Sequence, residues 1–102
     1  MENITYLTEE TYGPITTGSE AAVVDFYADW CGPCRMLRPT LEQISDERND
    51  VIAAAVNIDE NPELADMFGI TSIPCVILFK NGAEADRSIG LVPKESLEAL
   101  LG

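Results

Sequence analysis

Three short segments of this 102-residue chain are almost continuously apolar, and segments of a different character separate them. They are residues 21–28, 51–58 and 75–80. A strand that is buried on both faces of a sheet has this composition, because neither face can carry many polar side chains. We therefore predict that these segments are central strands. Two further strands are expected at residues 4–7 and 85–89.

A long helix is predicted after the first central strand. Its apolar face recurs at spacings of three and four residues, at Cys34, Leu37, Leu41 and Ile44. Pro33 suits the first turn of this helix. Pro39 lies inside the pattern and is expected to kink it.

Three shorter helices are also expected. Thr8 is predicted to cap the first of them, which Gly13-Pro14 should limit or bend. The second begins after Asn61 and ends at Gly69, and Pro93 opens the last one. All of these helices fall between predicted strands or at the end of the chain.

The order of elements predicts an α/β protein. Strands separated by helices favour parallel pairing, and Asn81-Gly82 predicts a two-residue hairpin that adds an antiparallel edge. The expected fold is a mixed central sheet of about five strands with helices on both faces. The length suits a single domain that spans residues 1–102.

Composition excludes several functions. Eighteen acidic and six basic residues give a net charge of −12, which repels nucleic-acid phosphates and anionic membrane surfaces. The chain has no histidine, so a Ser-His or Cys-His catalytic pair and a His-ligated metal are excluded. The first 34 residues contain no Lys or Arg and no long apolar run. A signal peptide is therefore not expected. The longest purely apolar stretch in the chain is residues 51–56, which is too short for a membrane helix, so a cytoplasmic location is expected.

The motif Trp30-Cys31-Gly32-Pro33-Cys34 lies between a predicted strand and a predicted helix. Two intervening residues let both sulfurs occupy the first helical turn, and Gly32 and Pro33 keep that turn tight. The helix N-terminus offers free N–H groups and a positive dipole end, which stabilise a thiolate at Cys31. We expect Cys31 to be exposed and to attack a disulfide. Cys34, on the apolar helix face, should be more buried and should resolve the mixed disulfide.

Other interpretations of these residues are less favoured. The two cysteines could form a structural disulfide or half of a zinc site. A structural zinc usually takes four Cys or His ligands, and this chain has only three cysteines. Trp30 could be a core aromatic residue, but its position directly before Cys31 favours a role in surface docking.

Asp25 is the one charged residue in the first central strand. A buried charge is costly, so this side chain could instead point into solvent, although a central strand leaves little room for that. A buried carboxyl group near Cys34 could accept the proton of that thiol, and desolvation would raise its pKa toward the working pH. We favour this second interpretation.

With these residues the chain closely resembles the thioredoxin family over essentially its whole length. A bare pair of cysteines two residues apart is weakly specific, but the full motif between this strand and this helix is highly specific. The matching segments are Val24-Asp25-Phe26, Trp30-Cys31-Gly32-Pro33-Cys34, Pro39, Asn57-Ile58-Asp59, Asn61-Pro62, Ile73-Pro74, Phe79-Lys80-Asn81-Gly82 and Gly90.

The resemblance implies a protein-disulfide reductase that carries electrons in cell redox homeostasis. It implies disulfide-containing target proteins and a thioredoxin reductase as partners, a monomer, and no cofactor or metal. It also implies that Asp25 accepts the proton of Cys34, and that Gly32 and Pro33 tune the redox couple. A cis Ile73-Pro74 bond should pack against the cysteine turn.

The resemblance further implies a substrate-docking surface beside the cysteines. Its mostly apolar members would be Trp30, Gly32, Pro33, Ile73, Pro74 and Gly90. An extended substrate segment could pair with the backbone at Ile73 like an added strand.

Two positions depart from the family pattern. Many thioredoxins carry a lysine where this chain has Ala55, so no cation offsets desolvation of Asp25 from that side, and a raised pKa is expected. Cys75 stands where threonine is usual. It could be an inert packing residue or could form an alternative disulfide with Cys31 or Cys34. We favour the inert interpretation, with a normal or raised pKa.

Two other functional classes remain as alternatives. A non-catalytic binding module could keep this fold inside a larger assembly, but the intact cysteine pair and Asp25 favour a redox carrier. A disulfide oxidase or isomerase is also possible chemically, whereas the Gly32-Pro33 dipeptide favours a reductant. The electron donor can be a flavin-dependent NADPH enzyme or a ferredoxin-linked one.

Overall fold

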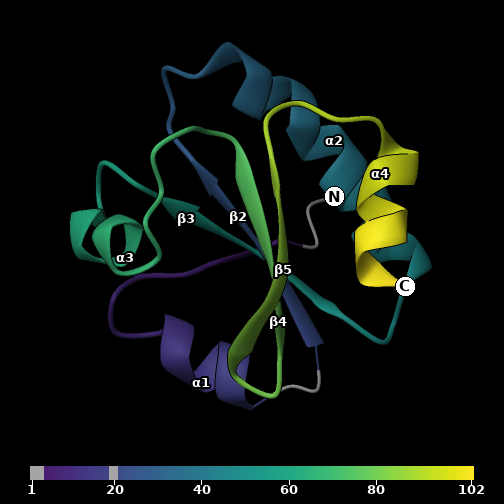
Figure 1. Ribbon diagram of the computed structural model, residues 1–102, viewed down its shortest axis with the longest axis horizontal. Coiled ribbons are helices and arrows are strands. Elements are labelled where there is room, and N and C mark those ends of the chain that lie inside the picture. The colour runs from purple at the N-terminus through teal and green to yellow at the C-terminus, as the bar shows by residue number, and fades with distance from the viewer. Residues whose placement is uncertain (1–3, 19–20) are drawn as a thin grey trace.

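A five-stranded mixed sheet with helices on both faces forms the protein, as the sequence predicts (Figure 1). The computed structural model describes residues 4–18 and 21–102. The elements in chain order are β1 (Thr5–Tyr6), α1 (Tyr12–Thr17), β2 (Ala21–Tyr27), α2 (Gly32–Glu47), β3 (Ile52–Asn57), α3 (Pro62–Met67), β4 (Cys75–Lys80), β5 (Ala83–Ile89) and α4 (Lys94–Leu101).

The strands lie in the order β1-β3-β2-β4-β5, which places β2 in the middle. Strand β3 pairs in parallel with both β1 and β2. Strand β4 runs antiparallel to β2, and β5 returns antiparallel to β4. The expectation that a strand reached through a helix pairs in parallel is therefore wrong for β4.

The direction of β4 follows from the length of α3. Six helical residues span only about 9 Å, whereas the six residues of β3 span about 20 Å. Helix α3 is thus too short to carry the chain back along the sheet. The chain enters β4 at the same end of the sheet where β2 and β3 finish. Ile73 and Pro74, directly before β4, lie at that end as well.

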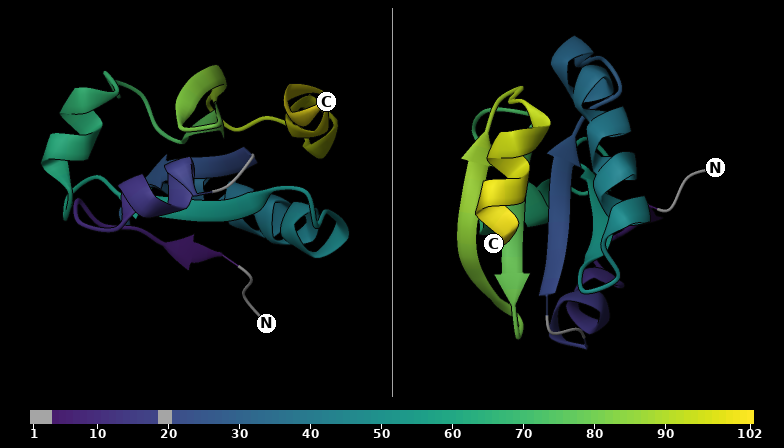
Figure 2. Two further views of the ribbon diagram at one scale, coloured as in Figure 1. Left: turned by 90° about the horizontal axis from the view of Figure 1, so that it is seen from below. Right: turned by 90° about the vertical axis from the view of Figure 1, so that its right-hand side faces the viewer.

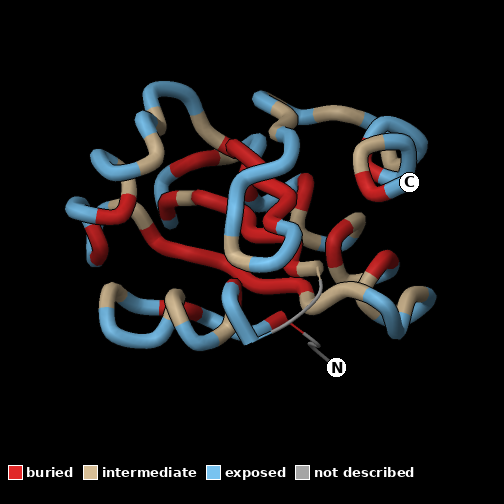
Figure 3. The backbone as a smooth tube through the Cα atoms, turned by 60° about the horizontal axis from the view of Figure 1, so that its bottom comes forward, coloured by how far each residue is buried: buried red, intermediate tan, exposed pale blue. Residues whose placement is uncertain are grey.

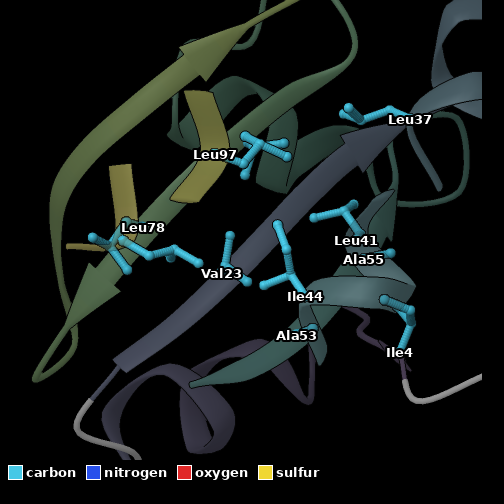
Figure 4. Close-up of a cluster of buried hydrophobic side chains, with 11 residues drawn as sticks. Ile4, Val23, Leu37, Leu41, Ile44, Ala53, Ala55, Leu78 and Leu97 are labelled. Atoms are coloured by element: carbon cyan, nitrogen blue, oxygen red, sulfur yellow. The ribbon is translucent and has the colours of Figure 1, made fainter. Parts of the chain in front are cut away.

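Side chains alternate between the two faces of the sheet, and each face has its own pair of helices. Helices α2 and α4 cover one face, which the right-hand view in Figure 2 presents to the reader. Leu41, Ile44 and Leu97 meet Val23 of the central strand there (Figure 4). Helices α1 and α3 cover the other face, whose core includes Phe26.

Burial follows this layered arrangement. The central strands run as a buried band through the molecule, while loops and outer helix faces are exposed (Figure 3). Within residues 4–18 and 21–102, no helix is both long and apolar enough to cross a membrane.

The first helix begins later than predicted. The backbone N–H of Tyr12 donates to the Thr8 carbonyl oxygen at 3.0 Å, which forms a turn before α1 rather than part of it. Thr11 is the N-cap, and Pro14 lies in the first turns of the helix. Proline lacks the N–H that a first turn leaves unpaired, so Gly13-Pro14 fits in the first turn of this helix and does not end it. Helix α2, by contrast, continues through Pro39.

The predicted hairpin is confirmed. Asn81 and Gly82 have φ values of 53° and 85°, as a two-residue hairpin of the mirror-image type requires. Strand β5 begins at Ala83, two residues before the predicted start.

Two constraints favour glycine at position 82: its positive φ and its close contact with Thr17. A Cβ atom added there would lie 2.9 Å from Cγ2 of Thr17, whereas one at Gly69 (φ 63°) would meet nothing within 4 Å. We expect Gly69→Ala to lower the free energy of unfolding by roughly 1 kcal/mol, because alanine is strained at positive φ. Gly82→Ala should lower it by roughly 1 kcal/mol more, because its Cβ would also crowd Thr17. Urea unfolding of the two oxidised variants measures this difference. Equal losses would show that Thr17 moves aside freely.

Candidate active site

The Cys31–Cys34 pair lies where strand β2 passes into helix α2. Cys31 is the N-cap of α2 and has an extended backbone, and Pro33 occupies the first turn. The backbone N–H of Cys34 donates to Sγ of Cys31 at 3.2 Å. The sulfur of Cys31 therefore takes one of the N–H groups that a helix N-terminus leaves unpaired.

The two sulfurs are joined as a disulfide, and the Cα atoms of the two residues are 5.2 Å apart. The pair packs against Ala28, with Ile58 and Ile73 beside it. Cys34 is 2% exposed and Cys31 is 5% exposed. The expected order of burial is correct, but the expectation that Cys31 is exposed is wrong for this disulfide form, because the bonded sulfur and the neighbouring isoleucines cover it.

Among the residues that the structure describes, no three His, Cys, Asp or Glu side chains are grouped so that they could hold a metal ion.

Trp30 lies on the surface, with 68% of the residue exposed. Its indole Nε1–H donates to Oδ2 of Asp59 at 2.9 Å. The Asn57 side chain holds this segment in turn, because its Oδ1 accepts the backbone N–H groups of Asp59 and Glu60. The sequence indicated an exposed Trp30 but gave no sign that Asp59 is its partner, since the two residues come from separate loops.

The Ile73-Pro74 peptide bond is cis, as the family resemblance implied. Ile73 is half-buried against the cysteine pair. The carbonyl oxygen of Pro74 accepts the backbone N–H of Gly90 at 2.7 Å, so the end of β5 is tied to the start of β4. The next residue on either side of Gly90, Ile89 and Leu91, is an exposed apolar side chain.

Asp25 is wholly buried in the middle of the sheet, with 0% exposure. It follows Val23 by two positions, so its side chain lies on the face covered by α2 and α4. Burial raises the pKa of this carboxyl group to about 6, and the nearby Arg38 guanidinium opposes that rise. The raised pKa is as predicted. Ala55 is its partner in the register of β3 and brings no charge.

Arg38 is the residue that sequence reasoning missed. Its Nη2 lies 3.6 Å from Oδ2 of Asp25, which is ion-pair distance but too long for a hydrogen bond. Arg38 follows Cys34 by four residues and is therefore one turn further along the same side of α2. This four-residue spacing could have predicted that Arg38 lies beside Cys34, but the prediction for this helix considered only its apolar residues.

Cys75 lies on the opposite face of the sheet from Asp25. It is 1% exposed and packs in the core that contains Phe26 and Ile77. Burial raises the pKa of its thiol, as expected for a residue inside a strand. Cys31 and Cys34 belong to a separate cluster.

Comparison with known proteins identifies the family. The thioredoxin family model matches residues 3–102. The chain is 48% identical over 96 residues to thioredoxin of Alicyclobacillus acidocaldarius subsp. acidocaldarius, which covers 93% of this chain and 91% of the relative.

Solved structures agree. A mutant thioredoxin from Halobacterium salinarum NRC-1 is similar with a TM-score of 0.89 and 32% identity, covering 98% of this chain and 90% of its own. A second similar chain comes from a structural study of the thiol resolving mechanism of yeast mitochondrial 1-Cys peroxiredoxin via glutathione and thioredoxin systems. Its TM-score is 0.87 and its sequence identity is 32%, and the match covers 94% of this chain and 91% of the other. The chain therefore belongs to the thioredoxin family, and its Cys31–Cys34 pair is the redox-active disulfide of a protein-disulfide oxidoreductase.

Proposed function

We propose that Cys31 is the attacking thiolate of this reductase, that Cys34 is the resolving thiol, and that Asp25 accepts the Cys34 proton. The observation that carries the assignment is the position of Cys31 at the N-cap of α2, with its sulfur accepting a helix N–H. Such a donor and the helix dipole favour a thiolate over a thiol, and thioredoxin itself is a standard example of this effect.

The reaction then proceeds in two exchanges. The Cys31 thiolate attacks one sulfur of a substrate disulfide, forms a mixed disulfide and releases the first substrate thiolate, which takes up a proton. Cys34 gives its proton to Asp25, and its sulfur attacks Sγ of Cys31. The Cys31–Cys34 disulfide forms, and the second substrate thiolate leaves. Two electrons pass from the cysteine pair to the substrate.

Asp25 suits the proton transfer because of where it lies. Arg38 ties its carboxylate to α2 one turn after Cys34. A pKa of about 6 lets the carboxylate be ionised at neutral pH and still hold a proton briefly. A solvent-exposed aspartate would bind the proton too weakly for this purpose.

Substrate docking is proposed on the surface around the disulfide. Trp30 directly precedes Cys31 in the chain, and Ile73 packs against the cysteine pair. Pro74 is buried behind Ile73, and its carbonyl oxygen accepts the backbone N–H of Gly90. The exposed indole and the exposed apolar side chains beside Gly90 support weak contacts that tolerate many sequences. Gly32 and Pro33 are assigned a tuning role, because residues between the cysteines set the redox balance of such a couple.

Family membership supports an assignment of partners. Disulfide-containing proteins are the substrates of this family, and we infer that a thioredoxin reductase returns two electrons and two protons to the Cys31–Cys34 disulfide. A solved structure similar to this chain comes from work on a thioredoxin system. We further propose that the protein is a monomer in the cytoplasm. Its net charge of −12 supports solubility at high concentration.

Replacement of one cysteine tests the two roles. Cys34→Ser should accumulate mixed disulfides with target proteins, because no thiol is left to resolve the bond to Cys31. Cys31→Ser is the matched control and should trap none. Mass spectrometry of captured complexes under non-reducing conditions provides the measurement. Trapping by Cys31→Ser in place of Cys34→Ser would reverse the assignment.

Asp25→Asn tests the proton acceptor. The resolving step should slow by roughly 10²-fold at pH 7, since an amide accepts no proton. Single-turnover reduction of a small aromatic disulfide separates the two thiol releases, and only the second should slow. Asp29→Asn makes the same charge change at an exposed position and should leave the rate unchanged. An unchanged second release in Asp25→Asn would rule out Asp25 as the acceptor.

Asp25→Asn should also be more stable than the parent protein. Below pH 4 the Asp25 carboxyl is protonated in both folded and unfolded chains, so the difference vanishes. Between pH 4 and about 6 the unfolded chain releases this proton while the folded chain retains it, and the parent loses stability. Above that range Asp25→Asn should be more stable by on the order of 3 kcal/mol in urea unfolding.

Cys75→Thr tests the third cysteine. Turnover should be unchanged, and one slowly reacting thiol should disappear, because Cys75 is buried in a separate cluster and its pKa is raised. Alkylation followed by mass measurement counts the thiols. An abundant linkage from Cys75 to Cys31 or Cys34 after peroxide treatment would instead make Cys75 a regulatory residue.

A further inference from the structure

Arg38 occupies a position that the reaction chemistry alone does not explain. Its side chain is 18% exposed, and its Nη2 stands 3.6 Å from the fully buried Asp25 carboxylate. A cavity of about 270 Å³ opens beside it, lined in part by Cys34 and Tyr27. Arg38 therefore touches the buried acid and also lines a cavity that reaches the resolving cysteine.

Two tyrosines hold the guanidinium in place. Its central carbon lies 4.6 Å from the ring centroid of Tyr27 and 5.4 Å from that of Tyr6. Its Nη1 donates to the Tyr6 hydroxyl at 2.6 Å, and the two rings meet edge to face. A planar cation between two aromatic faces and an acceptor loses little further freedom when it approaches a carboxylate.

The cation comes from the helix because the sheet offers none at this point. Asp25 pairs in register with Ala55 on one side and Val76 on the other, and neither carries a charge. The charged group against the carboxylate is Arg38 from α2, at 3.6 Å. The other titratable groups nearby are Cys34 from α2, Tyr27 from β2 and Tyr6 from β1, which line the cavity beside Arg38, and Cys75 from β4, on the opposite face of the sheet. Of these groups, Arg38 alone is positively charged.

The contact is an ion pair without a hydrogen bond. Among the described residues, the two carboxylate oxygens of Asp25 have no hydrogen-bond partner, and Nε of Arg38 has none either. A charge-assisted hydrogen bond would hold the carboxylate firmly ionised. An ion pair at 3.6 Å opposes desolvation only in part, so the carboxyl group can release and regain a proton near neutral pH.

We propose that Arg38 is a positioning residue for the second exchange, and that its clamped guanidinium keeps the Asp25 carboxylate ionised and ready to take the Cys34 proton. This inference rests on the proposed role of Asp25. It assigns to α2 both the resolving thiol and the cation that makes its proton acceptor effective.

Arg38→Met removes the charge and keeps an unbranched side chain against the Tyr27 ring. The pKa of Asp25 should rise from about 6 to about 7 or higher, which lowers its ionised fraction at pH 6 roughly fivefold. The carboxyl ¹³C shift of Asp25 in the oxidised protein measures this pKa cleanly, because Cys31 and Cys34 do not titrate in a disulfide. The pH profile of the second thiol release should move upward by the same amount.

Matched variants separate position from charge. Arg35→Met removes the same charge from the same helix at an exposed position that bonds to the Asp29 carbonyl, and it should leave the Asp25 pKa unchanged. Arg38→Lys should shift the Asp25 pKa in the same direction as Arg38→Met but less, since it keeps a cation and loses the planar fork. Adding Ala55→Lys to Arg38→Met supplies a cation from the facing strand and should restore the profile.

The outcomes distinguish this inference from the role of Asp25 itself. An unchanged Asp25 pKa in Arg38→Met, or an equal rise in Arg35→Met, would overturn the positioning role. If Arg38→Met does not fold, Arg38→Lys decides, and an Asp25 pKa equal to that of the parent overturns the proposal. A shifted pKa with an unmoved rate profile would contradict the part of Arg38 in catalysis, and Asp25→Asn would then show whether Asp25 acts at all.

Discussion

Helix α2 packs its apolar side on the central strand β2, and this contact fixes the positions of the cysteine pair, Asp25 and Arg38 relative to one another. Leu37, Leu41 and Ile44 are all buried on the face of the sheet that Val23 shares. With the helix held in this way, its first residue lies at the end of β2 and its second turn lies over the buried acid of that strand. The redox pair and Arg38 are thus placed by the same hydrophobic surface that stabilises the fold.

The directions of the strands bring several segments of the chain to the end of the sheet where the disulfide lies. Strands β2 and β3 both finish there, and the short α3 returns the chain to the same end, so that β4 starts there. In Figure 1 the start of α2, the loop before β4 and the end of β5 all lie at the upper edge of the sheet. Three distant segments of sequence therefore lie together at the end of the sheet that holds the disulfide.

The sequence was sufficient wherever a single local rule decided the outcome. Continuous apolar runs located the central strands, Asn81-Gly82 located the hairpin, and the motif around Cys31 located the start of α2. Errors arose where the outcome depended on distances between elements. The direction of β4 depends on the length of α3, and the cover over Cys31 depends on isoleucines from other loops. Periodicity within one segment contains neither quantity.

The same limit explains why Arg38 escaped notice. A basic residue at the edge of an apolar helix face ordinarily extends its stem over the core and its charge into water. Here the carboxylate of Asp25 and the rings of two tyrosines make the inward position favourable instead. One buried negative charge can offset one cation, and a second cation at Ala55 would leave a surplus positive charge without water or partner. The neutral Ala55 on the neighbouring strand and the cationic Arg38 on α2 are therefore linked, because together they leave Asp25 with a single positive partner.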